Sequence, residues 1–345
     1  MTKHALSRLV RWAGYLAVAF VIPYVFVAPS SRLLVSTALI YALLAASWNL
    51  TLGFGGIFNF AHAGMFGIGG YAMAIATLKW QWDSIPSLAF AVLVGAIVGG
   101  LTYLPVIRMR GIYIALITFV FVQISYHLVL ALPELTGGSN GLPGVPAITI
   151  AGQSLARFGG LGYLWLLGAA VAAMLIILEL IMAGPFGHSL VALRDNEQLA
   201  QSRGVNRLRQ QFIAFVVSGA MAGFTGALYV AYFRVADVSL FGFGLVTLGL
   251  SMIFLGGTRQ IWGPVVGAVV ITLADHRLTG LDAWRPVVFA AGTIAVLIFA
   301  PGGISAALVR GAAALRGRFT GPGRPDATPP TGSPSRIPQR SIEHA

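Results

Sequence analysis

The sequence predicts an all-α integral membrane protein, a polytopic helical bundle of about ten transmembrane spans. Only 9% of the 345 residues are charged and 57% are hydrophobic, whereas about a quarter of the residues in soluble domains are charged. Several apolar stretches reach the roughly 20 residues that a helix needs to cross a hydrocarbon layer. The 43 glycines suit helices that approach one another closely within a membrane.

Ten apolar runs, each bounded by charged residues, proline or glycine, mark the expected spans. In chain order they cover residues 12–28, 33–52, 56–78, 86–107, 111–132, 161–183, 211–233, 240–256, 261–274 and 286–300. The last two runs are short for a full crossing, so tilted, broken or re-entrant helices are the alternatives there. Basic residues before the first run resemble a secretory signal, but no clear small-residue cleavage site follows, which favours a retained helix.

Positive charge divides the predicted loops into two unequal sets. With an even number of spans both termini share one side, and that side carries most of the 22 Lys and Arg residues. Because cytoplasmic loops are enriched in these residues, we expect both termini and the loop 184–210 on the cytoplasmic side of the membrane, and the loop 133–160 outside. The net charge of +12 has the same explanation, so binding to nucleic acid is not expected.

The C-terminal residues differ in composition from the rest of the chain. Residues 311–345 are rich in Pro, Gly, Ser and Arg and contain few apolar side chains. Such a segment cannot bury enough apolar surface to offset the entropy lost on ordering. The sequence therefore predicts a transmembrane domain over 1–310 and a disordered, basic cytoplasmic tail over 311–345.

Enzymatic and metal chemistry find little support in the sequence. An ATP-binding P-loop needs a lysine behind a glycine-rich turn, and neither Lys3 nor Lys79 follows one. The chain is therefore not expected to hydrolyse ATP itself. It has no cysteine, and His62 and His127 have no partner at ligand spacing, so neither a metal site nor a cofactor is expected.

Ser139 and Glu179 each admit a rival interpretation. Ser139 lies in a Gly-Gly-Ser-Asn-Gly run that matches the nucleophile elbow of serine hydrolases, with His276 or His127 as its base; a turn-rich external loop is the favoured alternative. Glu179 is the one carboxylate inside a predicted span and would suit a proton-coupled secondary transporter. The favoured alternative is that its carboxylate reaches the interface or pairs with Arg194.

The most polar internal run is FGHSLVALRDNEQLAQSRGVN, residues 186–206. Ser189 is suited to cap a helix that runs to Arg203, where Gly204 ends it in a left-handed conformation. Four residues share one face of this helix at helical spacing: Leu190, Leu193, Glu197 and Ala200. That face suits the groove of a partner protein; a solvated amphipathic loop lying on the lipid headgroups is the alternative.

This run resembles the cytoplasmic loop of the M-type permease subunits of branched-chain amino acid ABC importers, which reads like GRALRAIRDNExxAxxxGIN. Ten residues match in register: Gly187, Leu190, Leu193, Arg194, Asp195, Asn196, Glu197, Ala200, Gly204 and Asn206. His188 stands where the family usually has Arg. Four more segments resemble family motifs in the same order: WNLTLGFGGIFNFAHAGMFGIGGYAMA, RMRGIYIALITFVFVQI, LTGGSNGL and FLGGTRQIWGPVVGAVV.

The resemblance implies a type II-like ABC importer permease that is not itself an enzyme. It implies, besides the lipid bilayer, a second permease of the H-type, two ABC ATPase subunits that hydrolyse ATP, and an extracytoplasmic substrate-binding protein. The polar loop would couple permease to ATPase through Gly187, Leu190, Leu193, Arg194, Asp195, Glu197, Ala200 and Gly204. The substrate would be leucine, isoleucine or valine, with urea or another small solute as the alternative.

The glycine-rich segment 48–74 suggests a translocation path. Its closely spaced glycines allow a span to pack tightly, or to break near the membrane midplane and free backbone groups toward a water-filled path. Asn59 and His62 would lie one helical turn apart, so both side chains are candidates to line that path. The alternative is that they hold helices together by hydrogen bonds.

Overall fold

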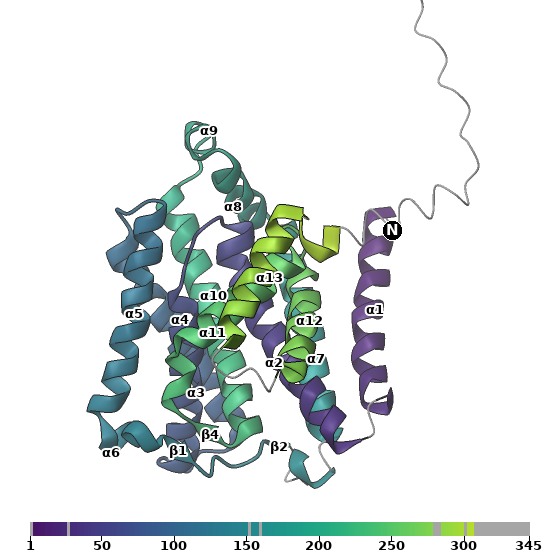
Figure 1. The fold of residues 1–345 in the computed structure, drawn as a ribbon. Coiled ribbons are helices and arrows are strands. Elements are labelled where there is room, and N and C mark those ends of the chain that lie inside the picture. Colours follow the sequence, from purple (N-terminus) through teal and green to yellow (C-terminus); the bar gives the residue numbers. More distant parts are fainter. Residues whose placement is uncertain are drawn as a thin grey trace, which may run out of the picture. The chain divides into compact units, whose positions relative to one another are not determined.

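The structure is a computed structural model that describes residues 3–25, 28–150, 153–158, 161–278, 284–299 and 302–306. The predicted tail, 311–345, lies outside the described residues. Helices make up most of the described chain (Figure 1).

The longest helices lie in the first two-thirds of the chain. They are α1 (Lys3–Val25), α2 (Pro29–Asn49), α3 (Ala61–Leu78), α4 (Ser84–Val106), α5 (Ile112–Ala131), α7 (Leu161–Ala183) and α10 (Arg207–Phe233). The shorter helices are α6 (Pro133–Thr136), α8 (Pro185–Asp195), α9 (Glu197–Ser202), α11 (Phe243–Gly256), α12 (Gly263–Arg277) and α13 (Arg285–Phe299). A π-helical turn, η1 (Leu50–Phe54), extends α2.

The remaining elements are short 3-10 turns and strands at the ends of the helices. The turns are η2 (Gly138–Asn140), η3 (Leu155–Phe158) and η4 (Val238–Phe241). Strand β1 (Leu142–Pro143) pairs antiparallel with β4 (Val235–Ala236), so the segment after α6 is joined to the end of α10. Strand β2 (Thr149–Ile150) pairs antiparallel with β3 (Gln153–Ser154).

Six described helical segments are long and apolar enough to cross a membrane. They are Ser30–Phe54, Ala61–Leu78, Ser84–Val106, Ile112–Ala131, Leu161–Ala183 and Arg207–Phe233, with Phe243–Gly256 as a shorter apolar helix. A polytopic helical membrane protein is thus confirmed, whereas the count of ten spans is not. The third predicted span, 56–78, also begins too early, because its helix starts at Ala61 after an irregular stretch in which Gly56 has a φ of +64°.

Glycines allow α3, α4 and α10 to pack backbone against backbone. A Cβ atom on Gly69 would lie 2.3 Å from the Cα of Gly223, and one on Gly226 would lie 1.9 Å from the carbonyl oxygen of Phe66. Neither approach is possible for a residue with a side chain. The tight packing predicted for the glycine-rich segment is therefore confirmed, and it places α3 against α10 in the centre of the bundle.

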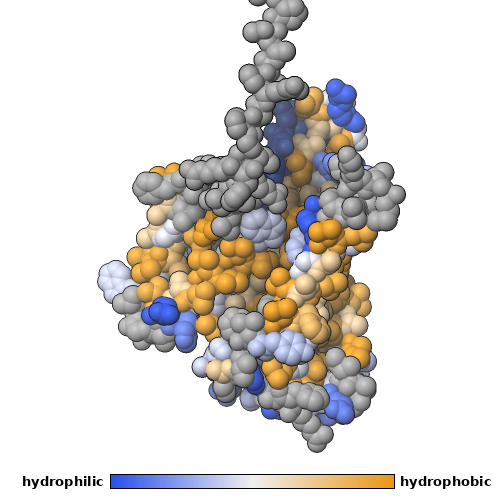
Figure 2. Space-filling model, turned by 90° about the vertical axis from the view of Figure 1, so that its right-hand side faces the viewer, coloured by the Kyte–Doolittle hydropathy of each residue, from blue (hydrophilic) through white to orange (hydrophobic). Residues whose placement is uncertain are grey.

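The outer surface of the bundle is largely apolar. Large hydrophobic side chains stand exposed along α5, among them Ile112, Leu116, Val120, Ile124 and Leu128. On the face shown in Figure 2, hydrophobic residues fill most of the middle, and hydrophilic residues gather mainly toward the two ends. A soluble monomer rarely exposes so continuous an apolar surface, so this surface suits contact with lipid.

Positive charges gather at one end of the helices. Figure 1 shows α8 and α9 at the end where α1 begins, and β1, β2 and β4 at the opposite end. The elements at the α8–α9 end carry Arg8, Arg11, Arg108, Arg110, Arg194, Arg203, Arg207, Arg209 and Arg259, whereas those at the opposite end carry Arg32, Lys79, Arg157, Arg234 and Arg277. The unequal division expected from the sequence therefore holds in space among the described residues.

Candidate functional site

The polar run folds as two helices rather than one. Helix α8 begins with Pro185 in its first turn and ends at Asp195, and α9 follows after Asn196, whose backbone is extended. The Asn196 Oδ1 accepts a hydrogen bond from the Leu199 amide at 3.0 Å and so caps the second helix. The predicted unbroken helix is therefore wrong. Ser189 is not its cap, since its hydroxyl donates to the Pro185 carbonyl oxygen at 2.8 Å.

The predicted end of the run is confirmed. Gly204 has a φ of +87°, and its amide donates to the carbonyl oxygen of Gln201 at 2.9 Å. The amide of Val205 donates to the carbonyl oxygen of Ala200 at 3.1 Å. These two bonds form a Schellman motif, which requires the left-handed conformation that glycine adopts at no steric cost.

The predicted docking face of this run is turned toward the protein itself. Leu190, Leu193 and Ala200 are all buried, so they hold the loop on the bundle and are not open to a partner. Gly187 makes this arrangement possible, because a Cβ there would lie 2.4 Å from the Cα of Met182 at the end of α7. The side chains that are exposed instead are His188, Ala192, Asp195, Asn196, Gln198, Leu199, Gln201, Ser202, Arg203 and Asn206.

Arg194 connects α8 with the irregular stretch between α2 and α3. Its Nη1 donates to the Gly53 carbonyl oxygen at 3.0 Å, and its Nη2 lies 2.8 Å from Oδ1 of Asp195. Its aliphatic stem packs over Gly56, where a Cβ would lie 2.5 Å from the Arg194 Cγ. The break in the glycine-rich segment, residues 55–60, therefore begins at the α8–α9 end of the bundle, in contact with this loop.

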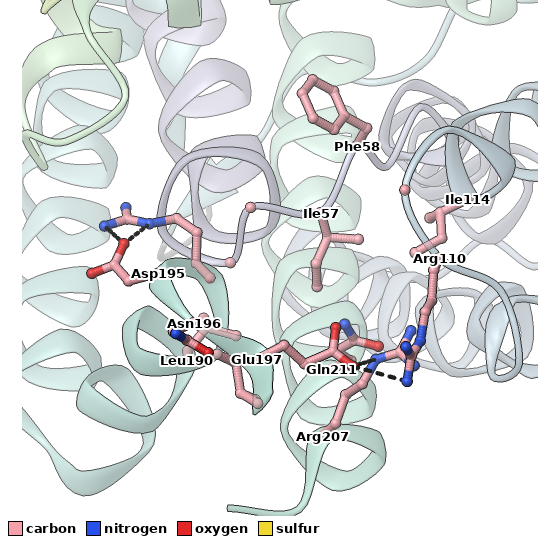
Figure 3. Close-up of a pocket in the computed structure, with 15 residues that line it drawn as sticks. Ile57, Phe58, Arg110, Ile114, Leu190, Asp195, Asn196, Glu197, Arg207 and Gln211 are labelled. Atoms are coloured by element: carbon pink, nitrogen blue, oxygen red, sulfur yellow. Dashed lines mark hydrogen bonds and ion pairs between the residues drawn. The ribbon is translucent and has the colours of Figure 1, made fainter. Parts of the chain in front are cut away.

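Glu197 connects α9 with two further elements. Its Oε1 lies 3.2 Å from Nη2 of Arg110, just before α5, and 3.7 Å from Nε of Arg207, in the first turn of α10. Arg207 is buried, and its Nη2 donates to the Met109 carbonyl oxygen at 2.6 Å. Figure 3 shows Glu197, Arg110 and Arg207 converging on one side of a cavity, with Asp195 on the other.

This cavity, which we call the coupling pocket, has a volume of about 210 Å³. Its walls come from the break, the start of α5, the α8–α9 corner and the first turns of α10. The lining residues are Gly55, Gly56, Ile57, Phe58, Arg110, Gly111, Ile114, Leu190, Leu193, Arg194, Asp195, Asn196, Glu197, Arg207 and Gln211. Five of the eight residues that the sequence predicted for coupling thus meet the break in one pocket, together with Arg110 and Arg207, which sequence reasoning missed.

Asn59 and His62 lie away from this pocket, in the contact between α2 and α3. Nε2 of the fully buried His62 is 3.0 Å from the Ser47 hydroxyl, and its ring stacks on Trp48. The Trp48 indole donates to the Asn59 carbonyl oxygen at 2.7 Å, and the Asn59 Oδ1 accepts from the Ala61 amide at 3.0 Å. The sequence predicted that the two residues lie one turn apart on a helix. That prediction is wrong, because Asn59 precedes α3.

Glu179 has a different partner from the one expected. Its Oε1 accepts from Arg11 Nε at 3.1 Å and from the Tyr15 hydroxyl at 2.9 Å, and its Oε2 accepts from Trp12 Nε1 at 2.8 Å. All three donors belong to α1, so the pairing with Arg194 is wrong. The carboxylate fixes α1 to α7.

The other candidate chemistries gain no support from the described residues. Ser139 is exposed in η2, a short 3-10 turn. A nucleophile elbow requires instead a strand, a tight turn and a helix. Gly137, Gly138 and Gly141 all have positive φ, as a turn-rich loop requires. Within the described residues no group of three or more His, Asp or Glu side chains is placed to hold a metal ion.

Comparison with known proteins relates the chain to transport permeases. The family model for "Branched-chain amino acid transport system / permease component" matches residues 32–301. The permease protein LivM of a high-affinity branched-chain amino acid transport system in Salmonella typhimurium is 28% identical over 291 residues, which cover 77% of this chain and 68% of LivM. No solved structure matches the chain.

Two further relatives extend the range of this similarity. A probable branched-chain amino acid permease protein LivH from Methanocaldococcus jannaschii is 28% identical over 299 residues, covering 79% of this chain and 92% of LivH. The permease protein LsrC of an autoinducer 2 import system in Photorhabdus laumondii is 34% identical over 152 residues, covering 39% of this chain and 45% of LsrC.

Proposed function

The chain belongs to the family of branched-chain amino acid transport system permease components, and from that premise we propose that it is the membrane-spanning permease subunit of an ABC importer for leucine, isoleucine or valine. It pairs with an H-type permease, receives substrate from an extracytoplasmic binding protein and is driven by two separate ATPase subunits. It crosses a bacterial inner membrane about ten times with both termini in the cytoplasm. A related permease for another small solute is the alternative, since one relative is named for autoinducer 2 import.

The link between the polar loop and the break between α2 and α3 is the observation that carries the mechanism. The ATPases bind the exposed side of α8 and α9, and ATP-driven movement displaces this pair of helices. Arg194 passes the displacement to Gly53 and Gly56, while Glu197 passes it to the first turns of α5 and α10 through its ion pairs. The break then moves relative to α10 and opens the path toward the cytoplasm.

The eight coupling residues have three separate roles in this scheme. Leu190, Leu193 and Ala200 anchor the loop by burial, and Gly187 and Gly204 give it its shape. Of the remaining three, Arg194 and Glu197 transmit the movement, and Asp195 orients the guanidinium group of Arg194 through their ion pair.

Asn59 and His62 belong to the path itself in this proposal. Both side chains are fully buried, and the Asn59 Nδ2 and His62 Nδ1 atoms have no hydrogen-bond partner among the described residues. Buried polar atoms of this kind are rare. Movement of the break would expose them to the substrate, whose ammonium and carboxylate groups need hydrogen-bond partners.

Reconstitution of the complete transporter tests the coupling role. In proteoliposomes that contain both permeases and both ATPases, supplied with binding protein and leucine, Arg194→Ala should reduce uptake at least tenfold while the ATPases still co-purify and hydrolyse ATP. Arg108→Ala is the matched control, because Arg108 is an exposed arginine at the same end and lies outside the coupling pocket. Normal uptake by Arg194→Ala, or loss of the ATPases from it, would contradict transmission through Arg194.

A further inference from the structure

A second polar cavity lies at the α8–α9 end of the protein, beside the N-terminal half of α1. It has a volume of about 360 Å³ and lies between the first turns of α1, the end of α7 and the turn that joins α11 to α12. Arg8, Arg11, Arg259, Tyr15, Trp262 and Glu179 are among the residues that line it. It shares no lining residue with the coupling pocket, and no step of the proposed transport mechanism uses it.

The charge of this second cavity is strongly positive. Three arginines and one carboxylate line it, and the two oxygens of Glu179 already accept hydrogen bonds from Arg11, Trp12 and Tyr15. Arg8 and Arg259 make no ion pair or hydrogen bond with any described residue. Two exposed arginines on different elements therefore line the same cavity with N–H donors that no described residue occupies. Arginine donors of this kind suit the oxygens of a phosphate group.

The position of the cavity favours a phosphate that belongs to a lipid. Helix α1 packs on the bundle mainly through α7, and its outward side chains Leu9, Leu16 and Phe20 are about half exposed. The cavity thus lies where an apolar outer surface meets the charged end of the protein. Trp262 and Tyr15 in its lining are residue types that concentrate at the headgroup level of membranes.

We propose that this cavity binds the phosphate headgroup of an anionic phospholipid, with Arg8 and Arg259 as its principal ligands and Trp262 beside the glycerol region. The headgroup would join α1 to the α11–α12 turn, two elements that otherwise share no ion pair among the described residues. A basic pocket between membrane helices is a general setting for anionic headgroups.

Retention of phosphatidylglycerol by the complete transporter tests this site. The probe is the purified complex of both permeases and both ATPases, incubated with mixed micelles that contain phosphatidylglycerol or phosphatidylcholine and examined by native mass spectrometry. The wild-type complex should retain phosphatidylglycerol in preference to phosphatidylcholine. The double variant Arg8→Gln/Arg259→Gln should bind it about thirtyfold more weakly, because the two arginines near a headgroup contribute about 1 kcal/mol each. The double control Arg108→Gln/Arg209→Gln removes two exposed arginines from the same end and should bind as the wild type does.

Three results would overturn the proposal. The first is equal retention of phosphatidylglycerol by the wild-type complex and the Arg8→Gln/Arg259→Gln variant. The second is full displacement of the lipid by millimolar inorganic phosphate, which would make this a site for a free anion. The third is a selective loss of stability. Thermal unfolding in phosphatidylcholine micelles should be the same for both double variants, and a melting temperature lowered only in Arg8→Gln/Arg259→Gln would assign the two arginines to folding instead. Failure of leucine uptake would leave these outcomes unchanged, because lipid retention does not depend on the substrate.

Discussion

Glu197 shows how one side chain can join three elements of the chain. Its carboxylate is the anion between Arg110 and Arg207. The role of Glu197 therefore depends on its position as well as on its charge. The pair with Arg110 is exposed on the arginine side, and exposed ion pairs contribute at most about 1 kcal/mol each, so its loss alone would not unfold the protein. A reversal of charge is different, because it places a third cation beside Arg110 and Arg207 and pushes α9 away from α10.

Substitution at Glu197 should therefore separate transport from folding. We expect Glu197→Gln to retain roughly half of the wild-type uptake, since the amide oxygen can still accept from Arg110, and Glu197→Lys to lose uptake nearly completely. Both proteins should insert and bind the ATPases. Leucine uptake normalised to inserted protein measures the effect, and wild-type uptake by Glu197→Lys would contradict a transmitting role.

Glu179 illustrates a residue whose partner could not be found from sequence. Arg194 was the nearest cation beyond the end of its helix, but the actual partner, Arg11, lies 168 positions away. Which two helices are neighbours depends on the packing of the whole bundle, and one chain read alone does not determine it. The sequence did indicate that a carboxylate near a helix end needs a partner.

Loss of charge at Glu179 should affect stability more than transport. Glu179→Gln removes the charge-assisted bond to Arg11, and we expect a loss of about 1–2 kcal/mol of stability with ATP-driven uptake within about twofold of wild type. Thermal unfolding in detergent and uptake in the presence of a protonophore measure the two quantities. A proton-coupled carrier would behave in the opposite way, with uptake abolished both by the substitution and by the protonophore.

At the scale of single elements, the apolar runs predicted the helices well because length and hydrophobicity alone determine a membrane helix. The polar loop was harder. The break between its two helices at Asn196 did have a local sequence signal, because Asn196 is an N-cap residue and Glu197 follows it in the first turn of the next helix. The apolar residues that recur at helical spacing across this break favoured one continuous helix instead. The burial of the loop's apolar face had no signal in the sequence, because the same pattern of apolar residues serves a helix that packs on its own bundle and one that packs on a partner.

The left-handed end of α9 can be tested by replacing one residue. Gly204 has open space around its Cα, so any effect of substitution comes from its φ of +87°. Gly204→Val should cost about 1–2 kcal/mol or more, since β-branched residues are strongly disfavoured there, and should impair uptake without preventing insertion. Gly204→Asn is the control, because asparagine tolerates the left-handed region, and it should transport nearly as the wild type does. Equal uptake by the two variants would show that the Schellman motif is dispensable.

The contact between α3 and α10 depends on glycine for a different reason, which is space. Gly226→Ala would place a Cβ 1.9 Å from the Phe66 carbonyl oxygen, so the helices must separate, at a cost of at least about 1–3 kcal/mol. Gly244→Ala, in α11, meets no atom within 4 Å and serves as the control. Thermal unfolding of the two purified proteins should show a lowered melting temperature only for Gly226→Ala; equal values would mean that α3 and α10 are not in backbone contact.

At the scale of the whole molecule, orientation in the membrane rests on the distribution of charge. Nine described arginines lie on elements of the α8–α9 end, and this bias predicts that the end faces the cytoplasm. The proposed function requires the same orientation, since ATPases are cytoplasmic and a binding protein delivers substrate from outside. The distribution of charge and the proposed function therefore predict the same orientation, with the α8–α9 end in the cytoplasm.

The absence of cysteine from the chain allows that prediction to be tested directly, because each introduced cysteine is the only thiol. Ser202→Cys places it on exposed α9 and Asn140→Cys on exposed η2 at the opposite end. In spheroplasts that lack the ATPases, a membrane-impermeant maleimide should label Asn140→Cys from outside and should label Ser202→Cys only after the membrane is opened. Ala46→Cys, buried inside α2, is the control and should react only after denaturation. Labelling of Ser202→Cys in intact spheroplasts would reverse the orientation and remove α8 and α9 from the reach of any ATPase, whatever their contacts with the break.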